Sequence, residues 1–90
     1  MTTLIQTYDE QEEETIITPA EGKRIVVWNI KARYANNIVL GFASRELLAL
    51  SGDGEIINPS MFSSEGGIDE SLVLSCGAGT TIKILYEEVE

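Results

Sequence analysis

Residues 22–43, GKRIVVWNIKARYANNIVLGFA, decide the fold of this 90-residue chain. The stretch holds two runs that are typical of strands, KRIVVWNIKARY at 23–34 and NIVLGFA at 37–43, because both are rich in β-branched and aromatic residues. At their junction, Asn36-Asn37 supplies a turn, since asparagine tolerates the left-handed backbone conformations that tight turns require. The stretch therefore predicts an antiparallel hairpin of two strands.

The first of these strands is predicted to be apolar on both sides. Side chains alternate between the two faces of a strand, so Ile25 and Val27 share one face, which Lys31 and Arg33 continue. The opposite face takes the residues between them, namely Val26, Trp28, Ile30 and Ala32. We expect the domain's own second sheet to cover one face, and a neighbouring subunit or the N-terminal segment to cover the other.

Further strand-like runs follow, separated by residues that favour turns. Turns are predicted at SGDG (51–54), at Asn58-Pro59 and at GAG (77–79). The runs around them are EIIN at 55–58, LVLSC at 72–76 and TTIKILYEEV at 80–89, while SRELLALS at 44–51 reads as a strand or a short helix. Six to eight short strands predict an all-β, single-domain antiparallel β-sandwich or jelly roll.

The N-terminal segment, residues 1–22, differs from the rest in charge. It contains six acidic residues and no basic one, and YDEQEEE at 8–14 is nearly all charged or polar. Self-repulsion predicts that this run stays solvated as a loop, or as an arm that docks on a basic partner. Leu4-Ile5 and Ile16-Ile17 on either side could form short edge strands. Residues 23–90 are then the β-sandwich core.

Composition argues against several classes of function. The chain has no histidine and one cysteine, so it lacks the usual ligands of zinc, haem and iron-sulfur clusters and every catalytic triad that uses imidazole. Its net charge of -9 argues against binding free nucleic acid. It has no apolar run of about 20 residues and no signal-peptide pattern. We expect a soluble, unprocessed protein that is not an enzyme and has no catalytic residue, cofactor, metal or membrane partner.

Cys76 and the acids of the turns are the remaining candidates for chemistry. Cys76 continues the alternating series of Leu72 and Leu74, so we predict a buried thiol rather than a nucleophile. The acidic groups at 53–55 and 69–70 could bind calcium weakly or act as paired carboxylates. Acids beside glycine in turns usually serve the conformation of the turn, which is the interpretation we favour.

An interface is the functional feature that the residues themselves suggest. Four of the six basic residues lie in 22–43, and Arg45 follows closely. The cluster of Lys31, Arg33 and Arg45 is too small for nucleic acid but suits ion pairs with an acidic surface. Trp28 and Tyr34 fall on one face of the same strand, where they either pack in the core or form a platform for a sugar. The predicted interface comprises Trp28, Lys31, Arg33, Tyr34 and Arg45.

Two segments resemble small virion proteins of tailed bacteriophages. AEGKRIVVWNIKARYANNIVLGFAS at 20–44 resembles their opening hairpin, and LVLSCGAGTTIKILYEEVE at 72–90 resembles their last one. The resemblance covers about half the chain; ELLALSGDGEIINPSMFSSEGG at 46–67 fits only loosely, and the acidic N-terminal run has no counterpart.

The resemblance implies both a fold and a function. These virion proteins are β-sandwiches or jelly rolls, and many are capsid decoration (cement) proteins or head-fibre components. It therefore implies a homo-oligomer, with a trimer as the first state to test, that is made in the host cytoplasm and binds the major capsid protein on the virion surface. The alternative is a fibre module that recognises a host glycan through residues 60–67 and the Asp53 loop.

Overall fold

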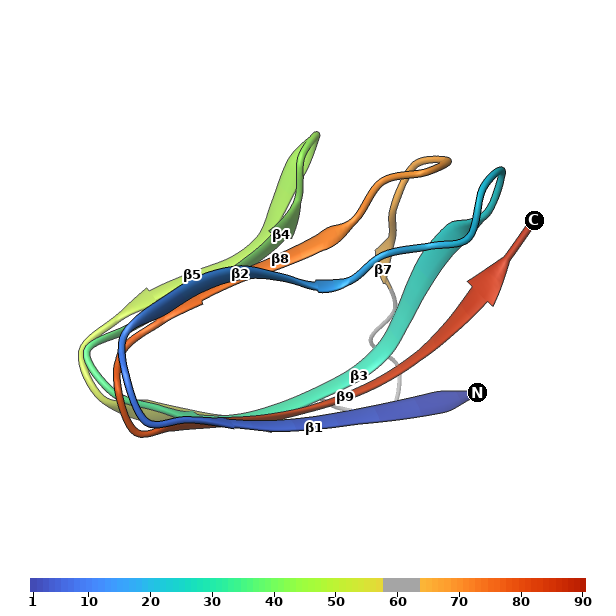
Figure 1. The fold of residues 1–90 in the computed structure, drawn as a ribbon. Helices are drawn as coiled ribbons and strands as arrows, with labels where there is room; N and C mark the ends of the chain where they lie inside the picture. Colours follow the sequence, from blue (N-terminus) through green and yellow to red (C-terminus); the bar gives the residue numbers. More distant parts are fainter. Residues whose placement is uncertain (58–63) are drawn as a thin grey trace.

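The computed structural model describes residues 1–57 and 64–90, which form two antiparallel sheets and no helix (Figure 1). Sheet A has the strand order β1-β9-β3-β6, with the short β7 also paired to β3, and sheet B has the order β2-β8-β4-β5. The expected all-β sandwich is confirmed, and SRELLALS forms a strand. The strands are β1 (Thr2–Tyr8), β2 (Glu12–Ile17), β3 (Arg24–Tyr34), β4 (Asn37–Phe42), β5 (Arg45–Ser51), β6 (Gly54–Ile57), β7 (Ser64–Glu65), β8 (Leu72–Cys76) and β9 (Thr80–Val89).

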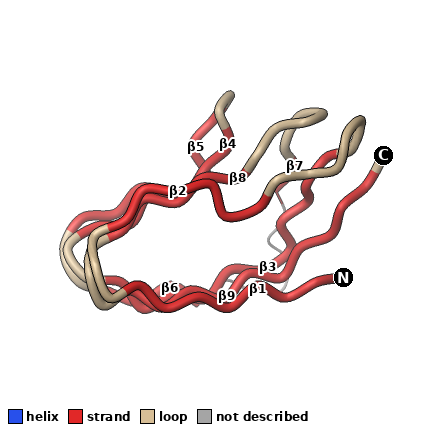
Figure 2. The backbone as a smooth tube through the Cα atoms, in the orientation of Figure 1, coloured by secondary structure: helices blue, strands red, loops and turns tan. Residues whose placement is uncertain are grey.

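The strand pairs are nested around the β4–β5 hairpin. Outside β4–β5 come the pairs β3–β6, β2–β8 and β1–β9, as in one long hairpin that has been folded over on itself. Six connections (β1–β2, β2–β3, β3–β4, β5–β6, β7–β8 and β8–β9) therefore pass from one sheet to the other. Figure 2 shows loops gathered at one end of the sandwich, where they join its two layers. This arrangement is that of a jelly roll.

The predicted hairpin between 23–34 and 37–43 is wrong, because β3 lies in sheet A and β4 in sheet B. The turn itself is confirmed: Asn36 has a positive φ of 67°. The last two strands, β8 and β9, are divided between the sheets in the same way. A tight turn between two amphipathic strands is compatible with a hairpin, in which the strands pair within one sheet, and with an arch, in which they lie in two facing sheets. The arch lets the apolar faces of the two strands pack against each other.

A β-bulge at Trp28 changes the faces of β3. The register against β9 shifts between Val27 and Asn29, so one extra residue is inserted in β3. The bulge turns both halves of the apolar pattern inward, and the residues buried in the core are Ile25, Val27, Ile30, Ala32 and Tyr34. The predicted division of these residues between two faces is therefore wrong. Lys31 and Arg33 do not share a face with Ile25; they are exposed on the outer side.

The core lies between the two sheets, where the alternating patterns of the later strands are confirmed. Leu72, Leu74 and Cys76 of β8 are fully buried, as predicted. They face the other inward residues of both sheets, including Ile38 and Leu40 of β4 and Ile82 and Ile84 of β9. Cys76 thus serves as a small apolar side chain in the core.

The N-terminal segment forms one edge strand of each sheet. β1 pairs with β9 in sheet A, and β2 pairs with β8 in sheet B. Leu4 and Ile16 pack against the core. The glutamates at 12–14 therefore lie on a strand rather than in a loop, and the turn is confined to residues 9–11. Their charges are tolerated because β2 is an edge strand at which Glu13 and Glu14 remain exposed.

Candidate functional site

The predicted interface residues are distributed over three parts of the molecule. Trp28 is half-buried on the outer side of sheet A, where its Nε1–H donates a hydrogen bond of 2.9 Å to Glu87 Oε1. Tyr34 is buried between the sheets, against Gly54. Because the bulge separates their faces, Trp28 and Tyr34 do not form one aromatic platform.

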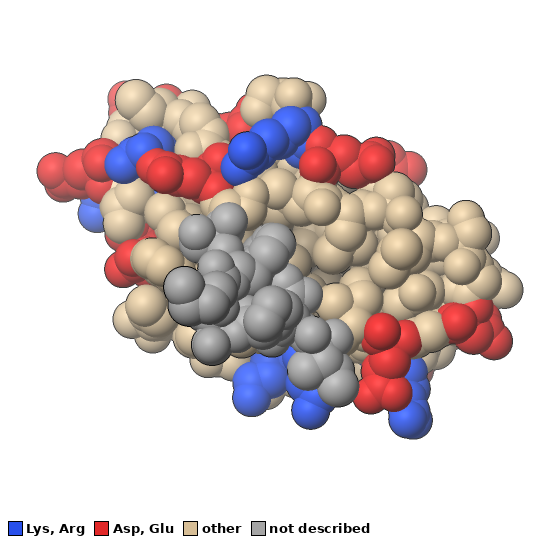
Figure 3. Space-filling view, turned by 180° about the vertical axis from the view of Figure 1, so that it is seen from behind, with Lys and Arg blue, Asp and Glu red and all other residues tan. Residues whose placement is uncertain are grey.

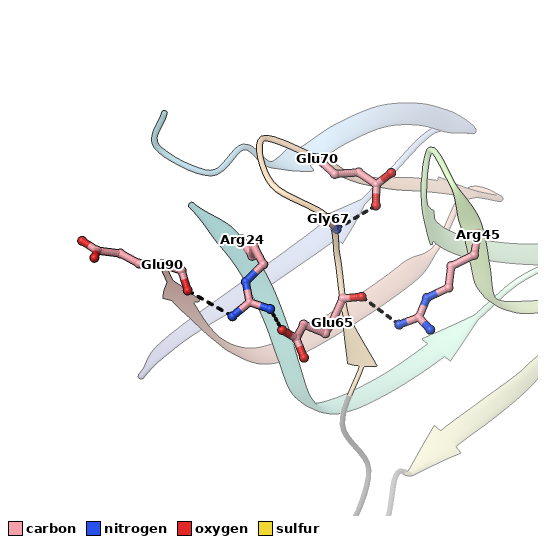
Figure 4. Close-up of polar contacts among 6 residues, drawn as sticks. All are labelled: Arg24, Arg45, Glu65, Gly67, Glu70 and Glu90. Atoms are coloured by element: carbon pink, nitrogen blue, oxygen red, sulfur yellow. Dashed lines mark hydrogen bonds and ion pairs between the residues drawn. The ribbon is translucent and has the colours of Figure 1, made fainter. Parts of the chain in front are cut away.

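Arg45 belongs to a polar network that links β5, β7 and β3 (Figure 4). Its guanidinium donates to Ser64 Oγ at 2.6 Å and to the main-chain oxygen of Glu65 at 2.8 Å. Arg24 also reaches this segment, since it forms an ion pair with the carboxylate of Glu65 and donates to the main-chain oxygen of Glu90 at 3.0 Å. Arg45 therefore connects β5 to β7 within the chain.

The segment after β7 is held against the sandwich by further contacts. The N–H of Gly66 donates to the Ile25 carbonyl at 2.9 Å, and a Cβ at Gly66 would lie 2.6 Å from the Phe42 ring. Glu70 accepts hydrogen bonds from the N–H of Gly67 and from both the N–H and the hydroxyl of Ser44. These bonds stabilise its charged form and lower the pKa of Glu70 below its usual range.

The acids considered for calcium or catalysis accept bonds from the turns around them. Asp53 Oδ1 accepts the N–H of Asn36 at 2.9 Å, and Asp69 Oδ1 accepts the N–H of Gly22 at 2.7 Å. Glu55 lies 3.8 Å from the guanidinium of Arg33. In residues 1–57 and 64–90, the structure brings together no group of three potential metal ligands. Within the proposed glycan-binding region, residues 60–63 lie outside the described part, and Ser64 and Gly67 take part in the network above.

Lys31 and Arg33 meet a third cation on the outer side of sheet A, and we call Lys31, Arg33 and Lys83 the basic face. Lys31 lies directly opposite Lys83 in the β3–β9 ladder, two residues along β3 from Arg33. All three side chains are exposed. In Figure 3, Lys and Arg atoms project along the lower margin, the side on which sheet A lies in Figure 1. Half of the basic residues thus share one sheet face.

A shallow groove of about 430 Å³ runs over the basic face. Its lining combines charged groups with the exposed apolar side chain of Ile5, and comprises Ile5, Lys31, Ala32, Arg33, Glu55, Thr81 and Lys83. The positions of these residues relative to one another are fixed by the register in which β1, β9 and β3 pair. Such a surface can bind carboxylates on an opposing protein surface.

The electrostatics of the basic face are unfavourable in the isolated chain. Directly opposed like charges destabilise a strand pair, by an amount of the order of 0.2–1 kcal/mol. Among the described residues, Lys31 and Lys83 form no ion pair, and Arg33 has only its long contact with Glu55. A partner that supplies carboxylates would relieve this repulsion.

Lys83 is the member of the face that sequence reasoning missed. The alternation of Thr81, Lys83 and Leu85 with the buried Ile82 and Ile84 shows that Lys83 faces outward. The pairing of β9 with β3, which places Lys83 beside Lys31, joins segments about 50 residues apart and has no local signal.

Comparison with known proteins finds no relative: no protein family, curated protein or solved structure matches the chain. The described part of the chain also contains no helix that is long and apolar enough to cross a membrane.

Proposed function

We propose that this chain is a non-enzymatic structural protein of a virion, a capsid decoration protein that stabilises an assembled phage shell by docking on it through the basic face. The observation that supports this proposal is the gathering of Lys31, Arg33 and Lys83 on one sheet face of a chain with a net charge of -9. The resemblance of residues 20–44 and 72–90 to phage virion proteins suggests the shell as the partner.

The charge pattern favours docking in one orientation. An acidic shell surface attracts the basic face and repels the acidic remainder of the chain, so complementary charge selects the orientation and speeds association. Carboxylates of the shell would also neutralise the charges of Lys31 and Lys83 and so remove the repulsion between them. Each contact is modest, and repetition over many copies stabilises the shell as a whole.

The acids of the turns support a structural rather than a catalytic role. Asp53, Asp69 and Glu70 each accept hydrogen bonds from main-chain N–H groups that hold turns in place. A carboxylate committed in this way is not free to act as a general base without disturbing the fold.

Co-sedimentation with undecorated heads of tailed phages tests the proposal. We expect the wild-type chain to sediment with the heads and Lys31→Gln to bind at least several-fold more weakly. Thr15→Glu is the matched control, because it makes the same change in net charge at an exposed position of sheet B. We expect this control to bind like the wild type at moderate salt.

Two outcomes would overturn the proposal. If the wild-type chain binds none of the undecorated phage heads tested, it is not a decoration protein of these shells. If Lys31→Gln and Thr15→Glu weaken binding equally, net charge controls the association and the basic face is not the docking surface.

A further inference from the structure

The outer edge of β1 is an unprotected strand edge. β1 is the terminal strand of sheet A, and no described strand pairs with its other side. Its sequence, TTLIQTY, has seven residues and contains neither a charge nor a proline. A strand edge of this kind presents free N–H and C=O groups to any extended chain that approaches it.

The other sheet edges carry features that discourage pairing. β2 has three consecutive glutamates at 12–14 and a register shift near its end. β5 begins with Arg45-Glu46 beside another register shift. β6 has four residues, one of them Glu55. Charges, bulges and short length are the usual means of protecting an edge, and β1 uses none of them.

We infer that β1 pairs antiparallel with β1 of a second copy, around a two-fold axis at Ile5. Ile5 is the midpoint of the strand, so this register uses all seven residues. It places Ile5 opposite Ile5 of the second copy, Leu4 opposite Gln6 and Thr3 opposite Thr7. No charged residue meets another in the new ladder.

The side chains of β1 favour a second copy as the occupant. Ile5 is 65% exposed on the outer side of sheet A, and the two-fold axis brings two Ile5 side chains into direct contact. An antiparallel pair of identical strands is self-complementary, which is the requirement for a two-fold interface. The contact therefore buries the most exposed apolar side chain of β1 without burying a charge.

Pairing through β1 would extend the basic face, and in this respect the inference rests on the proposed function. Ile5 lies opposite Lys83, and Lys83 lies opposite Lys31. Joining two copies produces one continuous sheet in which the two Lys83 residues are three strand spacings, about 14 Å, apart. A dimer would thus present two basic faces in one plane and bind an acidic surface with higher avidity.

The acidic edge strand β2 restricts the contact to sheet A. The glutamates at 12–14 of both copies lie in the other layer on the same side of the sandwich, where they repel one another. Salt screens this repulsion, so we expect the dimer to become tighter as the ionic strength rises. A cyclic trimer would instead need β1 to pair with a different edge, and the other edges are the protected ones.

Solution mass and site-specific cross-linking test the inference. Light scattering over a concentration series should show a dimer for the wild type and a monomer for Ile5→Lys. Ala49→Lys, an exposed substitution on β5, should remain a dimer. Circular dichroism and thermal melting of each variant would show that the fold is retained.

Cysteine substitution reads the register directly. Ile5→Cys should form a disulfide-linked dimer on mild oxidation, because opposed residues of an antiparallel pair lie within disulfide range. Thr3→Cys should not, since the two Thr3 residues would be about 14 Å apart along the strands. Cys76 is buried and does not compete.

The outcomes separate this inference from the proposed function. A monomer at every concentration or a trimer would overturn pairing of β1 with a second β1, and cross-linking through Thr3→Cys but not Ile5→Cys would overturn the two-fold axis at Ile5. None of these results affects docking on a shell, which is measured independently. A dimer that cross-links through Ile5→Cys but binds no undecorated head would support pairing at β1 and overturn the proposed function.

Discussion

Lys31 and Lys83 lie directly opposite each other in the β3–β9 ladder, on the exposed side of sheet A. The two strands pair over most of their length, so the ladder keeps the two lysine residues next to each other whether or not a partner is bound. The isolated chain therefore bears an electrostatic cost at the surface that we propose for docking.

Replacing Lys83 by threonine should stabilise the isolated chain. The substitution removes the like-charge pair and introduces a residue that favours strands, so we expect the free energy of unfolding to rise by about 0.2–1 kcal/mol. Urea denaturation at low salt measures this change. Lys31→Thr should have a similar effect, and the double variant should gain less than the sum because both remove one repulsion. A loss of stability in Lys83→Thr would contradict the repulsion.

Adding a methyl group at Gly66 should destabilise the fold. A Cβ at this position would lie 2.6 Å from the Phe42 ring, and the Gly66 N–H is tied to the Ile25 carbonyl. We expect Gly66→Ala to lower the free energy of unfolding by about 1–3 kcal/mol. Gly67→Ala is the matched control, because its nearest atom would be Glu70 Oε1 at an ordinary 3.7 Å. Equal effects of the two substitutions in urea denaturation would contradict the packing of Gly66.

Replacing Arg45 should weaken the fold and leave docking unchanged. Arg45→Gln loses the guanidinium that bonds Ser64 and Glu65, and because the side chain is exposed we expect a loss of only about 0.5–1 kcal/mol. Urea denaturation measures this loss. Co-sedimentation with heads should match the wild type, which would distinguish Arg45 from the basic face. Weaker docking at unchanged stability would instead place Arg45 in the interface.

Glu70 should contribute to the acid sensitivity of the protein. Hydrogen bonds from Gly67 and Ser44 lower the pKa of Glu70 in the folded state. A lowered pKa means that the stabilisation is fully present above the ordinary glutamate pKa of about 4.3, and is lost as the pH falls through the folded value. Glu70→Gln should therefore be less stable than the wild type at pH 7, with a difference that shrinks below about pH 4.

Urea denaturation between pH 3 and 7 tests this prediction for Glu70. Glu13→Gln, an exposed position on β2, is the control for removing one negative charge. If the difference between Glu70→Gln and the wild type were the same at every pH, the hydrogen bonds would not depend on the charge of Glu70.

Cys76 should be unreactive in the folded protein. Its side chain is fully buried, and burial raises the pKa of the Cys76 thiol. We expect a thiol reagent at pH 8 to label the chain fully in urea and only at the rate of unfolding in buffer. Immediate labelling of the native chain, followed by mass spectrometry, would show that β8 does not hold Cys76 in the core.

The fold class followed from local patterns. Alternation of side chains along β8 predicted the buried positions of Leu72, Leu74 and Cys76 correctly. The bulge at Trp28 was not predictable, because an extra residue changes which later residues face inward and leaves no mark of its own in the sequence. The assignment of Lys31 and Arg33 to the face of Ile25 failed for this reason.

The candidate site depended still more on distant pairing. The sequence indicated that an acidic chain concentrates positive charge around residues 23–45, but it grouped Arg45 with Lys31 and omitted Lys83. Pairing of β3 with β9 puts Lys83 into the basic face, and the contacts to Ser64 and Glu65 take Arg45 out of it.

Residue periodicity and turn residues are local properties, and they sufficed to predict an antiparallel sandwich of short strands with Cys76 inside it. The choice between hairpin and arch at Asn36, the faces of β3, and the meeting of Lys31 with Lys83 were decided by the tertiary structure alone. The physical reason is that the partners and register of each strand are selected by the burial of two whole sheet faces against each other. Every strand contributes to that burial, so no single segment of the sequence determines it.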